Sequence, residues 1–110
     1  MANTFKNKVA ANIGTGGTTL YTVPSATTAT VIGLSVANTI ASSINVDVQV
    51  TDTSAGVTIY LIKDAIIAPY GNLVVVGGEQ KMVLETTDVV TITSSASTSA
   101  DAILSVLEIS

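Results

Sequence analysis

The chain has 110 residues, of which 47% are hydrophobic and only 11% are charged, and its formal net charge is −4. This length fits one compact domain, and the lack of cysteine excludes disulfides and thiolate metal sites. The four cations are isolated lysines without any arginine, so the clustered basic surface that nucleic-acid binding requires is missing. The apolar residues are mainly Val, Ile and Ala and the polar ones mainly Thr, which predicts an all-β protein.

The first 17 residues differ in character from the rest of the chain. Residues 1–13 end at a glycine-rich stretch, residues 14–17, which permits sharp changes of direction. A phosphate-binding loop is disfavoured there, because a strand rather than a helix is predicted to follow the glycines. We therefore predict an extended N-terminal arm and hinge over residues 1–17 and a single β-sandwich domain over residues 18–110.

Apolar residues recur along this arm. Val9, Ala11 and Ile13 alternate with polar or small residues, and Phe5 is the single phenylalanine of the chain. Such a segment can add a strand to the exposed sheet edge of a neighbouring subunit, or it can form an edge strand of its own domain. Phe5, Val9, Ala11 and Ile13 are accordingly the predicted partner-contact residues. Deleting residues 2–13 is expected to abolish binding to the partner while the domain still folds.

After the hinge, apolar residues alternate or form short runs between turn residues, which is typical of a β-sandwich or barrel. About eight strands are predicted, and they span residues 18–23, 30–36, 44–51, 57–63, 73–76, 82–85, 89–92 and 102–109. The strand at residues 44–51 has the clearest alternation, with one apolar and one polar face. A turn cluster follows it directly, so it is expected to form a hairpin with the next strand.

Two features nearer the C-terminus bear on contacts with other molecules. Pro69 and Gly71 predict a reversal of the chain that exposes Tyr70, a candidate loop contact. The last strand, residues 102–109, is apolar on both alternating sides and so needs cover on both faces. It is therefore expected in the middle of a sheet or against a neighbouring subunit.

The composition offers little for catalysis. Histidine, cysteine and arginine are all missing, so the commonest general base, the thiol nucleophile and the bidentate carboxylate clamp are absent. Asp47, Asp52 and Asp64 would bind calcium only if their strand ends met, and solvated carboxylates are the favoured interpretation. No segment has the length of a membrane helix or the pattern of a signal peptide. We predict a non-enzymatic protein without cofactor or metal that binds neither nucleic acid nor membrane.

The sequence also resembles a known family. The stretches LYTVPSATTATVIGLSVANT (residues 20–39), VDVQVTD (46–52), TIYLIKDAIIAPYGNLVVVGGEQKMVLETTDVVTITSSAS (58–97) and SVLEI (105–109) are similar to small virion structural proteins of bacteriophages that infect cyanobacteria and other marine bacteria. The N-terminal arm lies outside the matched region. The resemblance implies an immunoglobulin-like or jelly-roll β-sandwich that is present in many copies on the particle.

This resemblance implies a location in the virion after synthesis in the cytoplasm of the host bacterium. The expected function is that of a capsid decoration (cement) protein, which stabilises the shell through subunit contacts. The alternatives are an accessory subunit of the neck, tail or baseplate, and a host receptor- or glycan-binding module. The expected partners are the major capsid protein or other virion subunits. Few surface charges keep copies apart, so a homo-oligomer is also expected, with a trimer as one closed ring that fits.

Overall fold

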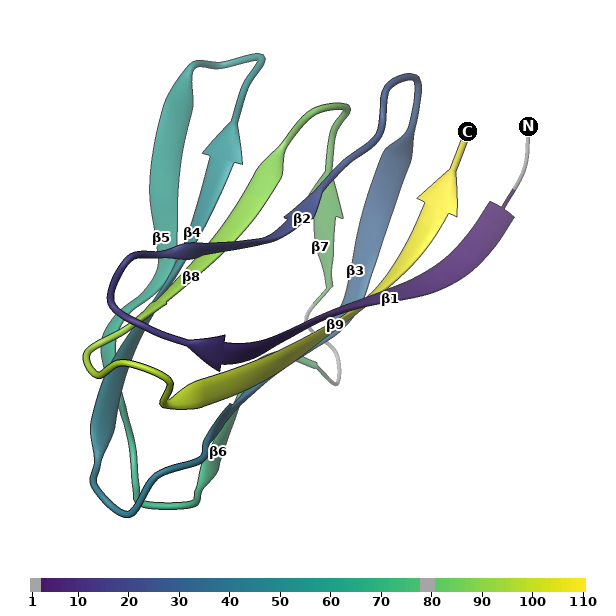
Figure 1. Cartoon of the computed structure of the whole chain (residues 1–110). Helices are drawn as coiled ribbons and strands as arrows, with labels where there is room; N and C mark the ends of the chain where they lie inside the picture. Colours follow the sequence, from purple (N-terminus) through teal and green to yellow (C-terminus); the bar gives the residue numbers. More distant parts are fainter. Residues whose placement is uncertain (1–2, 78–80) are drawn as a thin grey trace.

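The computed structural model describes residues 3–77 and 81–110, and all regular structure within them is β-strand. Two antiparallel sheets pack face to face (Figure 1). The strands are β1 (Asn3–Ile13), β2 (Thr18–Thr22), β3 (Thr28–Asn38), β4 (Ile44–Asp52), β5 (Val57–Ile67), β6 (Asn72–Val76), β7 (Met82–Leu84), β8 (Val89–Ser94) and β9 (Ala100–Ile109). The predicted all-β sandwich is confirmed. Among the described residues, no helix has the length and hydropathy needed to cross a membrane.

The strand order is that of a jelly roll. Sheet A has the order β1-β9-β3-β6, with β7 also paired to β3, and sheet B has the order β2-β8-β4-β5. The first half of the chain thus pairs with the second half in reverse order, from the central hairpin β4–β5 out to the terminal pair β1–β9. A double-stranded ribbon rolled up in this way forms two stacked sheets. The short strands β6 and β7 share one side of β3, so they jointly fill one strand position.

The core lies between the sheets and follows the period-two alternation of the strands. Val46 and Val48 are fully buried, whereas their neighbours Asp47 and Gln49 point outward. The predicted register of this strand and its hairpin with the next strand are confirmed. In β2 a bulge between Thr19 and Tyr21 breaks the alternation and so buries two consecutive residues, Leu20 and Tyr21.

The prediction of a separate arm over residues 1–17 is corrected by β1. This strand pairs antiparallel with β9 from Asn3 opposite Ile109 to Ile13 opposite Ala100, with a bulge between Ala10 and Ile13 (Figure 1). It is therefore the edge strand of sheet A, in line with the second alternative for this segment. The sequence underestimated this pairing because β9, whose two sides are both apolar, lies some ninety residues away along the chain.

The other predictions about turns and neighbours hold. The chain reverses at Pro69, where the Gly71 N–H donates a 2.8 Å hydrogen bond to the Ala68 carbonyl. Tyr70 occupies the left-handed region with φ of 57° and is 72% exposed. The final strand β9 lies in the middle of sheet A between β1 and β3, as predicted. Residues 78–80, between the strands predicted at 73–76 and 82–85, lie outside the described residues.

Candidate functional site

The outer face of sheet A is unusually apolar. Along β9, Ala102, Leu104 and Val106 face the core and are buried. The residues between them point away from the core, and these include Ile103, which is 45% exposed, and Leu107. This strand therefore presents apolar side chains on both sides, and only its inner side is covered by sheet B.

In the middle of sheet A, the pairing registers align outward residues in three rows that run across the strands. The central row is small or polar, and the two rows that flank it are mostly apolar. The first flanking row is Phe5, Leu107, Thr30 and Val83; the central row is Asn7, Ser105 and Gly33; the second flanking row is Val9, Ile103, Ser35 and Val74. These three rows contain no charged side chain, and we refer to them together as the outer face of sheet A.

The side chains at the ends of the flanking rows are well exposed, whereas Leu107, Thr30 and Ser35 between them are half-buried. Phe5 is 74%, Val9 69%, Val83 63% and Val74 60% exposed. Scattered exposed apolar residues are normal on soluble proteins, but a contiguous exposed patch of this kind marks a site of contact with another molecule.

The outer face of sheet B is different in character. Its strands β2, β4 and β8 present mainly threonine and other polar side chains, among them Thr19, Gln49, Thr91 and Thr93. Exposed apolar side chains on this sheet, such as Tyr60 and Ile66, belong to its edge strand β5. The two faces of the sandwich are thus chemically distinct, and the apolar one is the candidate functional surface.

The outer face of sheet A is also hollowed. A hollow of about 330 Å³ lies beside the second flanking row; it is lined mainly by apolar residues such as Val9, Ala37 and Ile103, and Asp101 lies at it as well. Another, of about 350 Å³, lies over the central row between Phe5 and Ile32. The face therefore combines projecting side chains with adjacent recesses, as a surface that packs against another protein does.

The structure brings only part of the predicted contact set to this face. Phe5 and Val9 project from it and Ala11 lines a hollow. Ile13 does not belong to the set, because it is 1% exposed and packs in the core. Tyr70 lies in the turn between β5 and β6, where its N–H donates to the Ile40 carbonyl, and not in the three rows.

Sequence reasoning missed the partners of Phe5 and Val9 on the neighbouring strands, namely Leu107, Ile103, Val74 and Val83. One signal pointed to part of this surface: the last strand was apolar on both sides and needed cover on both. The residues of β6 and β7 gave no such signal, since short apolar runs do not reveal which side faces the core.

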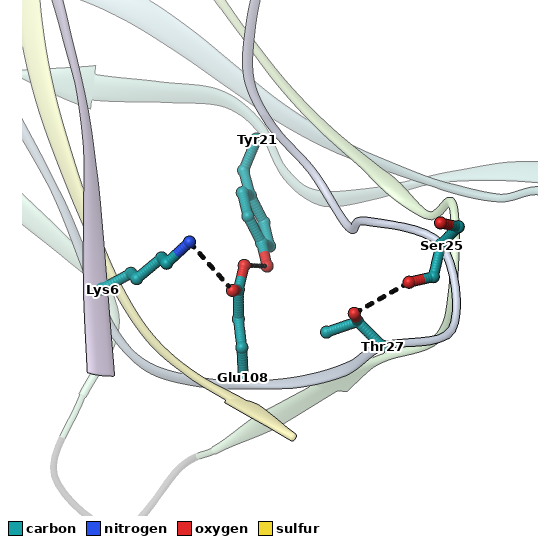
Figure 2. A network of polar contacts seen from close by, with 5 residues as sticks. All are labelled: Lys6, Tyr21, Ser25, Thr27 and Glu108. Atoms are coloured by element: carbon teal, nitrogen blue, oxygen red, sulfur yellow. Dashed lines mark hydrogen bonds and ion pairs between the residues drawn. The ribbon is translucent and has the colours of Figure 1, made fainter. Parts of the chain in front are cut away.

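A buried polar cluster joins the two sheets near the end of β9 (Figure 2). The Tyr21 hydroxyl on β2 donates a 2.5 Å hydrogen bond to Glu108 Oε2 on β9, and Lys6 Nζ on β1 lies 3.4 Å from Glu108 Oε1. Tyr21 is 2% and Glu108 7% exposed. The Glu108 carboxylate thereby receives a partner on each oxygen, which offsets part of the cost of burying its charge.

This cluster shifts two pKa values in opposite directions. The hydrogen bond from Tyr21, followed by the charge of Lys6, lowers the pKa of Glu108, although burial opposes this. Burial and the hydrogen bond to Glu108 raise the pKa of Tyr21 well above its ordinary value. Both groups are therefore engaged in holding β1, β9 and β2 together, as a structural contact between the sheets.

The stability of the protein is expected to depend on pH through this cluster. Because the pKa of Glu108 is lower in the folded state, its contribution is present above about pH 4.5 and disappears as the pH falls through the folded pKa. Because the pKa of Tyr21 is raised, its contribution is present below about pH 10 and declines above it. Urea unfolding between pH 3 and 7 checks the acid side. Glu108→Gln should flatten the acid dependence there, and an unchanged slope in that variant would contradict this account.

The aspartates considered for calcium do not converge. Asp47 Oδ1 accepts the N–H of Asp64 at 2.7 Å, whereas Asp52 lies at the opposite end of β4. Asp52 instead neighbours Glu85 and Asp88, with carboxylate oxygens within 4.8 Å of one another. The oxygens of Asp88 accept the N–H groups of Thr53 and Glu85, and Asp52 Oδ1 accepts from Ser54 and Ala55. The carboxylates of Asp52 and Asp88 hold turns together, which accounts for their positions.

Comparison with known protein families, with curated proteins and with solved structures found no match for this chain. The fold and the asymmetry between its two faces define a small jelly-roll protein with one outer face whose three central rows are mainly apolar and carry no charge.

Proposed function

We propose that this protein is a non-enzymatic structural subunit of a bacteriophage particle, and specifically a capsid decoration protein that stabilises the shell by contacts between subunits. The observation that carries the proposal is the apolar outer face of sheet A. A chain with 11% charged residues that leaves such a face exposed is suited to permanent burial in an assembly. The resemblance of the sequence to small phage virion proteins is the reason for proposing a phage particle as this assembly.

The fold by itself leaves the function open. Jelly rolls occur in viral capsid proteins, in lectins and in cupin enzymes, so the surface has to supply the argument. The uncharged outer face of sheet A favours a protein partner over a polar ligand. The partners under this proposal are the major capsid protein or other virion subunits, including further copies of the chain.

A glycan- or receptor-binding module is the competing function, and the aromatic residues argue against it. Such sites use aromatic side chains gathered on loops at one end of a domain. The exposed aromatics here are dispersed: Phe5 lies on β1, Tyr60 on β5 and Tyr70 in the turn after β5, while Tyr21 is buried. An accessory subunit of the neck, tail or baseplate uses the same kind of apolar contact, so only its location distinguishes it.

Locating the chain in a density map of intact virions tests the proposal directly. Many copies on the capsid surface are expected, and density confined to the tail or baseplate would replace decoration with the accessory role. Purified protein should also rebind to particles that lack it. If wild-type protein neither occurs in virions nor binds such particles, the proposed function is wrong.

A further inference from the structure

The outer face of sheet A has an internal symmetry that points to its occupant. On either side of the central row, the flanking rows carry the same chemical order across the sheet: two large apolar residues, a hydroxyl residue and a valine. We list both rows from β1 across the sheet. The first row is Phe5, Leu107, Thr30 and Val83, and the corresponding residues of the second row are Val9, Ile103, Ser35 and Val74. A surface whose two halves match in this way is complementary to a copy of itself.

A single rotation relates the matching residues. The axis lies along the central row, parallel to the surface of the sheet, and turns one copy over so that its outer face meets that of the other. Each residue of one flanking row then faces the corresponding residue of the other flanking row on the second copy. Phe5 of one copy lies over Val9 of the second, and Leu107 lies over Ile103.

The same rotation fits the remaining features of the surface. Thr30 meets Ser35, so hydroxyl groups face hydroxyl groups, and Val83 meets Val74. The exposed Phe5 ring of each copy arrives beside Val9 and Ile103, which line the hollow of about 330 Å³ on the other copy. Gly33 and Ser105 on the axis leave room for the projecting rows on both sides to approach.

The extent and charge of the face also suit a second copy. Four strand positions spaced about 4.8 Å apart and strands of about 11 residues give roughly 700 Å² for the whole outer side of sheet A, of which the three rows cover the central part, roughly 400 Å². Two whole outer sides would together bury about 1,400 Å², which is within the range of specific interfaces. The three rows carry no charge, and the rotation places the nearest outward charge on β9, Asp101, over Ile109 of the other copy and not over its own counterpart. Two chains with the same net charge of −4 therefore meet here without setting these carboxylates against each other.

Association of two copies through the exposed edge strand β1 is less favourable. An antiparallel contact between the β1 edges of two copies, centred on Asn7, would set Lys6 of each copy opposite Lys8 of the other. Like charges directly opposite each other on paired strands are destabilising, and lysines on an edge strand are a known protection against such pairing.

We propose that this protein forms a two-fold symmetric dimer in which the outer faces of sheet A pack against each other about the row Asn7, Ser105 and Gly33. This inference names the partner of the face on which the proposed function rests. In this dimer, sheet A of one copy lies about 10 Å from sheet A of the other, and the strands of the two copies are roughly aligned. An isologous contact of this kind joins two copies and no more, so a trimeric ring would need a different surface.

Sedimentation equilibrium of the purified full chain tests the dimer. Wild-type protein should be dimeric at micromolar concentration, and Ile103→Asp should raise the dissociation constant by about thirtyfold or more, because it buries an unpaired charge at the centre of the contact. Val74→Asp, on a different strand of the same face, should act likewise. Thr19→Asp on the outer face of sheet B is the matched control and should leave the dimer intact. Circular dichroism establishes that each variant is folded.

Cross-linking tests the register, since the chain has no cysteine of its own. With a short bismaleimide, Ser105→Cys should cross-link to itself across the axis. Phe5→Cys and Val9→Cys should cross-link efficiently when mixed and poorly when each is alone, whereas Thr19→Cys should not cross-link. A monomer, a trimer, a dimer unaffected by both Ile103→Asp and Val74→Asp, or equal cross-linking of every site would each overturn the inference.

Binding to particles separates this inference from the proposed function. If wild-type protein is monomeric in isolation but binds particles that lack it, the proposed function stands, and the inference that a second copy covers the outer face of sheet A is wrong. If the dimer forms with the predicted register but the protein is absent from virions and binds no particle, the dimer stands and the proposed function fails.

Discussion

Val48→Asp is expected to prevent folding. Val48 is fully buried in the middle of β4, between sheet B neighbours and the facing sheet, and no described cation lies in the core cluster around it. Burying an unpaired carboxylate there costs several kcal/mol, which is comparable to the total stability of about 5–15 kcal/mol for a domain of this size. Circular dichroism and thermal unfolding should show no cooperative transition. Val48→Ala, which removes about 2 kcal/mol, should still fold.

The adjacent position supplies the control. Gln49 points away from the core on the same strand, so Gln49→Asp introduces the same residue on the polar face and should change the unfolding free energy by about 0.5 kcal/mol or less. Equal damage from Val48→Asp and Gln49→Asp would mean that the register of β4 is wrong.

Deletion of residues 2–13 is expected to disrupt the domain as well as any binding. This differs from the expectation for a free arm, and the difference follows from β1. The deletion removes a strand paired to β9, the buried side chain of Ile13 and the Lys6 partner of Glu108. Truncating a buried isoleucine alone costs about 2–5 kcal/mol, and β9 would become an exposed apolar edge. The shortened chain should unfold or aggregate, as followed by circular dichroism and light scattering.

A double variant separates the strand from its outward side chains. Phe5→Ser with Val9→Ser keeps the backbone pairing of β1 and changes only residues that are largely exposed. It should fold with nearly unchanged stability but lose self-association. A deletion variant that folds with wild-type stability would show that β1 is dispensable to the domain and would restore the description of this segment as an arm.

The features that the sequence predicted well are local. The alternation of Val46 and Val48 with Asp47 and Gln49 identified the inner and outer sides of β4, and the turn at residues 52–56 identified its hairpin partner. The reversal at Pro69 and the exposure of Tyr70 followed from the backbone preferences of proline and glycine. Each of these depends on interactions within a few residues, so the residues themselves carry the signal.

The features that the sequence did not predict depend on pairing between distant segments. Nothing in residues 3–13 specifies that they pair with residues 100–109, and an amphipathic segment after a glycine-rich stretch suits a free arm as well as an edge strand. Likewise, the contact between Tyr21 and Glu108 joins residues 87 positions apart. A sequence pattern records which side chains are apolar but not which strand lies beside them.

The amino-acid sequence alone was thus sufficient to predict an all-β protein with the strands and turns that follow residue 17 and the core positions of β4, because period-two alternation and turn chemistry are properties of short segments. The three-dimensional pairing of the strands was needed to show that residues 3–13 belong to the sandwich and that apolar residues from four strands gather on one outer face. The physical reason is that hydrogen-bonded pairing in a jelly roll aligns residues from opposite ends of the chain, so a surface exists only once its strands are placed side by side.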